Sequence, residues 1–216
     1  MKRKTLFAVL LLALAQLPAS AQKKYSNPVY GSDFPDPSVE RADDGNFYAY
    51  ATGCKCRKSS DLISWTNVSN VISRPTWNDT TYVDADGNKK TDYYSFWACD
   101  VSKTVDGTFL MHYACALWGN VTRTGIGVAR GNEPSKFTDI GRMFRSTEIG
   151  VTNSIDPCYV EELDKKYLVW GSFHDIYLAE LTEDGTALKD SRQKTKLAGG
   201  AFEGTMIYKR GKYYYL

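Results

Sequence analysis

The chain has 216 residues, with 27 basic and 25 acidic side chains, 43% hydrophobic residues and 13% aromatic ones. This near-neutral balance lacks the basic surface that binding to nucleic acid requires, which argues against nucleic acid as a partner. The length allows one domain with a sizeable core.

The first 21 residues have the parts of a secretory signal peptide. Residues 1–5 hold three basic side chains, residues 6–17 are apolar, and residues 19–21 spell Ala-Ser-Ala, an A-x-A cleavage site. The apolar run is too short to span a bilayer, and no later stretch is long enough. We therefore predict export to the periplasm or the cell exterior, no membrane span, and a mature chain with a net charge of about −1.

The chain has an odd number of cysteines, and export would place them in an oxidising compartment. Because the number is odd, at least one cysteine is free or pairs with a partner outside the chain. Cys54 and Cys56 would point the same way along a strand, which is poor geometry for a bond between them. Further ligands for a metal site there are not evident. The five are Cys54, Cys56, Cys99, Cys115 and Cys158.

After the signal, short aromatic and β-branched runs recur between Gly, Asp and Asn, whereas the 3.6-residue period of helices is nearly absent. This pattern predicts an all-β fold. Four runs begin with a turn signal and continue as a buried or half-buried strand. They are D-G-N-F-Y-A-Y-A-T-G from Asp44, D-G-T-F-L-M-H-Y-A-C from Asp106, D-K-K-Y-L-V-W-G-S from Asp164 and R-G-K-Y-Y-Y-L from Arg210.

An acidic residue precedes each of these turns, and successive acids are 64, 56 and 47 residues apart: Asp36, Asp100, Asp156 and Glu203. This period suits the four-stranded blades of a propeller. Three units are complete and a fourth has begun, so we expect the chain to be the N-terminal part of a longer domain. Unpaired edges would leave such a part poorly stable alone.

The first strand of each propeller blade lies along the central channel, so the four acids would meet at one mouth. Clustered carboxylates repel one another and shift their pKa values, which is costly unless chemistry or a cation needs them. The structural alternative is that each acid caps a turn, and a single Asp beside Pro more often does. Four acids in register favour a functional cluster.

These motifs resemble glycoside hydrolase family 43, whose members are five-bladed propellers acting on arabinose- and xylose-containing plant polysaccharides. The resemblance runs from about Asp33 to the last residue, and implies a five-bladed β-propeller truncated after about three blades, with residues 22–216 as the N-terminal part of the catalytic domain. It is carried by D-F-P-D-P-S-V, W-A-C-D-V, N-S-I-D-P, Y-L-V-W-G-S-F, I-Y-L-A-E-L and F-E-G-T-M-I-Y-K-R-G-K-Y-Y-Y-L.

The resemblance also implies an inverting glycosidase with Asp36 as general base, Glu203 as general acid, and Asp156 as a third carboxylate that orients the acid. In such enzymes the base activates a water while the acid protonates the leaving oxygen, across roughly 6.5–9.5 Å. Ionised Asp156 would raise the pKa of Glu203 by repulsion. Pro35 and Pro37 would hold the backbone of Asp36.

Asp100 matches the acid of the family's W-A-P-D motif, but Cys99 stands in place of its proline, a departure that concerns the local backbone more than the catalytic triad. Sugars stack on aromatic rings and bond through their hydroxyls. Trp97 is the stacking candidate, and Asn153 and Ser172 are expected to contact hydroxyls.

Other features are weaker. For Trp118 and His174 a packing or rim role is as favoured as sugar contact, and His112 lies mid-strand and is predicted to pack. The run D-A-D-G-N-K-K-T-D from Asp84 has its Gly too early for an EF-hand, so we predict a solvated insertion between blades. Asp33 is predicted to support a turn. No cofactor or metal is required, although a structural calcium in the central channel of the full-length protein is possible by resemblance.

The substrate prediction follows from two motifs. Y-L-V-W-G-S-F-H-D-I-Y-L-A-E-L resembles the arabinan-cleaving branch, whereas F-E-G-T-M resembles members that release single arabinose or xylose units. We predict an arabinan-directed enzyme, with β-xylosidase as the alternative and endo or exo action open. A non-catalytic glycan-binding propeller is the second class, and a structural exported β protein would require the four-acid register to be chance.

Overall fold

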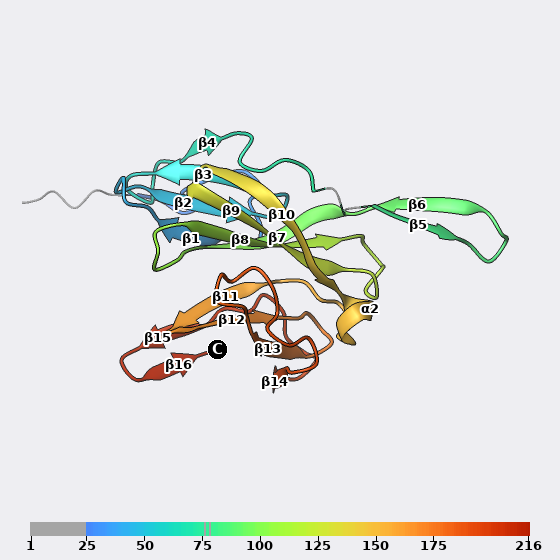
Figure 1. The fold of residues 1–216 in the computed structure, drawn as a ribbon. Coiled ribbons are helices and arrows are strands. Elements are labelled where there is room, and N and C mark those ends of the chain that lie inside the picture. Colours follow the sequence, from blue (N-terminus) through green and yellow to red (C-terminus); the bar gives the residue numbers. More distant parts are fainter. Residues whose placement is uncertain (1–24, 76, 78) are drawn as a thin grey trace, which may run out of the picture.

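The computed structural model describes residues 25–75, 77 and 79–216 (Figure 1), and the predicted signal peptide lies outside them. Regular structure in the described part consists of strands and one short helix, α2 (Ser146–Ile149). The all-β prediction is confirmed. No helix in this part of the chain has the length and apolar character needed to cross a membrane.

Three four-stranded antiparallel sheets follow one another along the chain, and in each the strands pair in chain order. This is the unit that the spacing of the acids predicted. The first sheet contains β1 (Ser38–Arg41), β2 (Phe47–Ala51), β3 (Lys55–Ser59) and β4 (Thr66–Val68); the second contains β7 (Ser95–Lys103), β8 (Phe109–Ala116), β9 (Gly125–Glu133) and β10 (Lys136–Arg145); the third contains β11 (Cys158–Glu162), β12 (Lys165–Trp170), β13 (Ile176–Glu180) and β14 (Thr195–Ala198).

Two hairpins lie outside these sheets. β5 (Asp79–Val83) and β6 (Lys89–Tyr93) project away from them between the first and second sheets (Figure 1). Their turn is closed by Asp84, whose Oδ1 accepts backbone N–H groups at 3.0 and 2.8 Å. The predicted insertion is therefore an Asx turn in a projecting hairpin. β15 (Tyr208–Arg210) and β16 (Tyr213–Tyr215) follow the third sheet.

The second sheet lies between the other two, and every residue of β8 is buried. Because side chains alternate across a strand, β8 supplies two cores. Met111 packs with Tyr50 of the first sheet, whereas Leu110 packs with Trp170 of the third. The second sheet is thereby packed against the first sheet on one face and against the third sheet on the other.

His112, also on β8, is fully buried as predicted. Its ring stacks on Tyr159 with centres 5.4 Å apart and planes at 12°. Its Nε2 lies 3.0 Å from the Gly185 carbonyl. Burial lowers the pKa of His112 to about 4, so the ring is neutral and fastens the third sheet to the second.

All five cysteines are buried and free. The prediction that Cys54 and Cys56 lie along one strand is wrong, because Cys54 lies in the turn before β3 with a φ of 49°. The two are not bonded to each other, and both belong to the core between the first and second sheets. Burial raises the pKa of Cys56 to about 12. These thiols therefore behave as small apolar side chains.

Gly127 on β9 provides a test of this packing. A Cβ there would overlap the Tyr113 ring and Trp77, whose side chains share a 2.8 Å hydrogen bond. We expect Gly127→Ala to lower the free energy of unfolding by about 1–3 kcal/mol, because overpacking forces the rings apart. Gly199→Ala is the control, since a Cβ there meets no atom within 4 Å. Equal urea midpoints for the two variants would contradict this packing.

Candidate active site

Asp36 and Asp156 occupy equivalent turns, each just before the first strand of a sheet, and we call these turns the Asp36 and Asp156 corners. Each lies two residues before the first strand of its sheet, and each precedes a proline. Each has a φ of 55°, in the left-handed region that few residues other than glycine adopt. Such conformations persist where the surroundings impose them, and they cluster at functional sites.

Asp36 is exposed and fixed by its neighbours. The Thr52 hydroxyl donates to its Oδ2 at 2.5 Å. The Thr52 backbone N–H donates to the Pro35 carbonyl at 3.1 Å, so the end of β2 holds both the corner and the carboxylate. Asp33, predicted to support the turn, is exposed and pairs with Lys55 at 3.6 Å.

Asp156 is half-buried, and its Oδ2 accepts the Gly204 backbone N–H at 3.2 Å. Burial, assisted by the nearby charges of Glu203 and Asp36 and opposed by the bond from the Gly204 N–H, raises its pKa to about 6. Asp36 and Glu203 therefore each lie within electrostatic reach of Asp156. In the structure the carboxyl group with the raised pKa is that of Asp156.

Glu203 lies in the loop between β14 and β15, where its Oε2 accepts the Ser172 hydroxyl at 3.1 Å. Ser172 is 1% exposed, and its carbonyl accepts the Asn153 amide at 3.0 Å. The backbone N–H of Phe173 donates to the Phe202 carbonyl at 2.9 Å, which ties this loop to the end of β12. Asn153 and Ser172 thus support Glu203, and their contact with sugar hydroxyls stays a prediction.

Ser172→Ala separates these two roles. If Ser172 orients Glu203, its loss should lower kcat by up to about tenfold with little change in KM, since a hydrogen bond contributes about 0.5–1.5 kcal/mol. If Ser172 binds the sugar throughout, KM should rise instead. Steady-state kinetics of the complete protein on arabino-oligosaccharides distinguish the two results.

A cavity of about 320 Å³ joins the starts of β1 and β11 to the middle of β7. Its wall includes Asp36, Asp100 and Asp156. Glu203 lines an adjoining cavity of about 230 Å³, and residues 204–206 line both. The acids predicted to meet at one mouth are brought together at these two neighbouring hollows.

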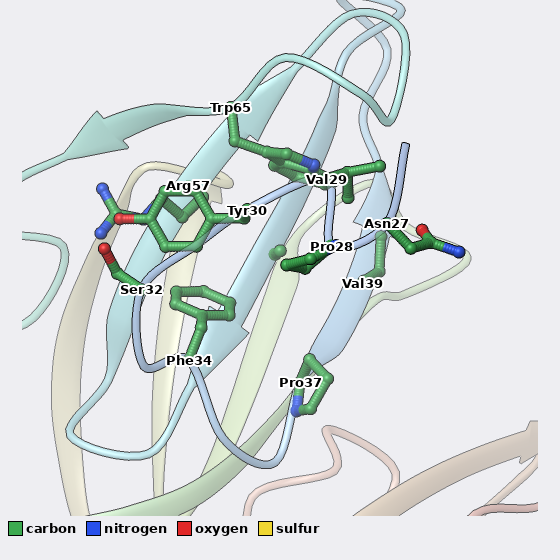
Figure 2. A pocket seen from close by; sticks show the side chains of 11 residues that line it. Asn27, Pro28, Val29, Tyr30, Ser32, Phe34, Pro37, Val39, Arg57 and Trp65 are labelled. Atoms are coloured by element: carbon green, nitrogen blue, oxygen red, sulfur yellow. The ribbon is translucent and has the colours of Figure 1, made fainter. Parts of the chain in front are cut away.

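A larger cavity, of about 640 Å³, lies on the outer face of the first sheet (Figure 2). Tyr30, Phe34 and Trp65 line it, and the Arg57 guanidinium carbon lies 4.3 Å from the centre of the Tyr30 ring. Asp36, Asp156 and Glu203 are not among the residues lining this cavity. The size of a cavity therefore does not identify the candidate active site, whereas the positions of the three carboxylates do.

The predicted stacking residue, Trp97, is half-buried and packs against Ile155, next to Asp156. Its ring centre lies 5.5 Å from that of Trp118, which is 86% exposed. The two rings form an aromatic pair beside the Asp156 corner. His174 is exposed, with Nδ1 3.3 Å from the Ser172 carbonyl, at the rim.

Two polar groups of the site were missing from the sequence prediction: the Thr52 hydroxyl and the Gly204 backbone N–H. Thr52 lies near the end of the run predicted from Asp44 and directly follows β2. Its position opposite the start of the preceding strand was a usable signal. A backbone N–H carries no such signal. No group of three or more His, Cys, Asp or Glu side chains in the described ranges is placed to hold a metal ion, so the predicted channel calcium stays a prediction.

Residues 25–216 match the model of the Glycosyl hydrolases family 43. The chain belongs to this family. Curated relatives of this family 43 chain include the probable arabinan endo-1,5-α-L-arabinosidase A of Aspergillus clavatus, 30% identical, with 89% of this chain and 60% of the relative covered. The probable arabinan endo-1,5-α-L-arabinosidase C of Aspergillus niger is 34% identical, with 84% and 57% covered.

Among solved structures, an exo-1,5-α-L-arabinanase from a bovine ruminal metagenomic library is similar to this family 43 chain. The TM-score is 0.68 at 27% identity, with 88% of this chain and 66% of that one covered. The α-L-arabinanase of Cellvibrio cellulosa has a TM-score of 0.67 at 18% identity, with 86% and 64% covered, and shows the fold alone. The chain spans about 57–60% of the length of the two curated relatives named above.

Proposed function

We propose that this protein is an inverting glycoside hydrolase that cleaves α-L-arabinosyl linkages in arabinan or arabinose-containing plant cell-wall polysaccharide. The observation that carries the proposal is the meeting of Asp36 and Asp156 at one cavity with Glu203 at the adjoining one. Burial, together with the charges of Glu203 and Asp36, raises the pKa of Asp156. A cluster of coupled acids at a cavity suits general acid–base chemistry. The names of the curated relatives and of the ruminal structure support arabinan as the substrate.

In the proposed mechanism, Asp36 accepts a proton from a water molecule that attacks the anomeric carbon. Glu203 donates a proton to the departing glycosidic oxygen, on the opposite side of the sugar. The Thr52 hydroxyl keeps Asp36 oriented, and the Ser172 hydroxyl does the same for Glu203. One carboxylate thus takes up a proton while the other gives one away.

Asp156 is the proposed third carboxylate, which orients Glu203. Burial, together with the charges of Glu203 and Asp36, raises the pKa of Asp156 to about 6, so this carboxyl group keeps its proton below that pH. The Trp97 and Trp118 rings, beside Asp156, are the proposed platform for the apolar face of the sugar.

We further propose that the complete domain is a five-bladed propeller of which the three described sheets are the first blades. Three blades of five agree with the share of the curated relatives that the chain spans. Export to the periplasm or cell exterior, by the predicted signal at residues 1–21, fits a polymeric substrate. A structural calcium in the channel of the complete domain remains part of this proposal.

Product analysis tests the activity. The complete protein is incubated separately with linear 1,5-arabinan and with xylo-oligosaccharides, and the products are resolved by chromatography. We expect arabinose or short arabino-oligosaccharides from the first substrate, with product size separating exo from endo action. Release of xylose alone would replace the proposal by β-xylosidase activity. Binding of either glycan without any product would make the protein a glycan-binding module.

A further inference from the structure

We propose that Asp100 is a positioning residue that sets the separation of Asp36 and Asp156 by bonding one carboxylate oxygen to each of the strands that follow them. This inference rests on the proposed function, because it assigns Asp100 a role in the same site. Asp100 lies in β7, between β1 and β11, and lines the cavity with both acids.

The first bond leads to Asp36. The Ser38 hydroxyl donates to Oδ1 of Asp100 at 2.8 Å, and the Oγ of Ser38 accepts the Val101 backbone N–H at 3.2 Å. Ser38 is the first residue of β1 and lies two residues after Asp36. Pro37, between them, has a fixed φ. The corner at Asp36 is therefore tied to β7 through one stiff residue.

The second bond leads to Asp156. The backbone N–H of Tyr159 donates to Oδ2 of Asp100 at 2.7 Å. β11 is the edge strand of the third sheet, and an edge N–H needs a partner from outside its sheet. Tyr159 lies three residues after Asp156, and Pro157 again stiffens the link. One carboxylate thus joins both corners.

A carboxylate suits this position because it accepts hydrogen bonds at two oxygens and donates none. Asp100 is half-buried at the wall of the cavity, and burial raises the pKa of its carboxyl group. An asparagine would offer one acceptor oxygen and turn an N–H₂ group toward a second donor. The geometry for an inverting reaction allows little freedom, since a misplacement of about 1 Å costs roughly 10²-fold in rate.

The alternative is that Asp100 only stabilises the fold, and Asp139 on β10 provides the matched control. Its Oδ1 also accepts one hydroxyl, from Tyr113 at 2.5 Å, and one backbone N–H, from Gly141 at 3.1 Å. β10 is the opposite edge of the same sheet from β7. Asp100→Asn and Asp139→Asn therefore make the same change of charge at carboxylates that accept one hydroxyl and one backbone N–H, near to and far from the acids. At Asp139 both donors share one oxygen, which asparagine keeps, whereas at Asp100 they use separate oxygens.

The test compares three variants of the complete protein: Asp100→Asn, Ser38→Ala and Asp139→Asn. Ser38→Ala breaks only the link to β1 and changes no charge, so it remains informative if Asp100→Asn does not fold. Each is measured for kcat and KM on arabino-oligosaccharides. The titration of the Asp156 carboxyl is followed by carbon NMR.

We expect Asp100→Asn to lower kcat by at least about tenfold and Ser38→Ala by about threefold, with KM nearly unchanged, because the acids are displaced without loss of sugar contacts. Both should move the Asp156 titration by about half a pH unit or more. Asp139→Asn should match the wild type in kcat and in the titration, even if its melting temperature falls.

Equal effects of Asp100→Asn and Asp139→Asn on kcat, or an Asp156 titration untouched by Ser38→Ala and Asp100→Asn, would overturn the positioning role. An inactive wild type would refute the proposed function instead. In that case the NMR titration still decides whether Asp100 positions Asp156, so the two failures are distinguishable.

Discussion

Glu203→Gln is expected to lower kcat on linear arabinan by roughly 10²–10⁴-fold, which is the range that a general acid contributes. The glutamine keeps the shape of the side chain and the bond from the Ser172 hydroxyl, but it has no acidic proton to give to the leaving oxygen. KM should change little, because binding of the sugar does not depend on that proton.

A substrate with a good leaving group sharpens this prediction. An aryl arabinoside departs without protonation, so Glu203→Gln should retain most of its activity on 4-nitrophenyl α-L-arabinofuranoside. Glu180→Gln is the control, because Glu180, on β13, pairs with Lys189 at 2.7 Å and with Lys165 at 3.4 Å, away from the acids. Equal losses on arabinan and on the aryl substrate would mean that Glu203 is not the acid.

Asp156→Asn is expected to stabilise the fold at pH 7 while reducing activity. The carboxyl of Asp156 has a pKa of about 6 in the folded protein against an ordinary value of 3.8. Between these values the unfolded chain ionises first, so the stability of the wild type falls as the pH rises from about 4 to 6. Asparagine removes this cost, which we place at about 2 kcal/mol after allowing for solvent access.

His112 also makes the stability of the fold depend on pH. Its pKa is lowered to about 4 in the folded protein, so the unfolded chain binds the extra proton and stability rises with pH from about 4 to 6.5. This slope opposes that of Asp156. We expect urea denaturation of Asp156→Asn to show stability rising over this range, whereas the wild type changes little. Parallel curves would contradict the raised pKa of Asp156.

The sequence predicted the repeating unit and the corners of the site because both depend on local pattern. The turn-plus-strand runs from Asp44, Asp106 and Asp164 became β2, β8 and β12, each the second strand of a four-stranded sheet. Asp36 and Asp156 could be paired because each precedes a proline just before a first strand. Such features are encoded within a few neighbouring residues.

The support around the acids could not be predicted because it crosses between sheets. The bond from Ser172 to Glu203 joins residues 31 positions apart. The bonds that Asp100 accepts come from Ser38 and Tyr159, which are 62 and 59 positions away. A serine in W-G-S-F gives no sign of whether its hydroxyl faces a sugar or a carboxylate. The pKa of Asp156 likewise depends on burial, which only the packed sheets determine.

The stereochemistry of the product tests the central claim most directly. The complete protein is added to linear α-1,5-arabinan in an NMR tube, and the anomeric protons of new reducing ends are recorded before mutarotation. An inverting reaction by Asp36 and Glu203 predicts that the β-anomer forms first, with no signal from Glu203→Gln. First appearance of the α-anomer, or no new reducing ends from the wild type, would contradict it.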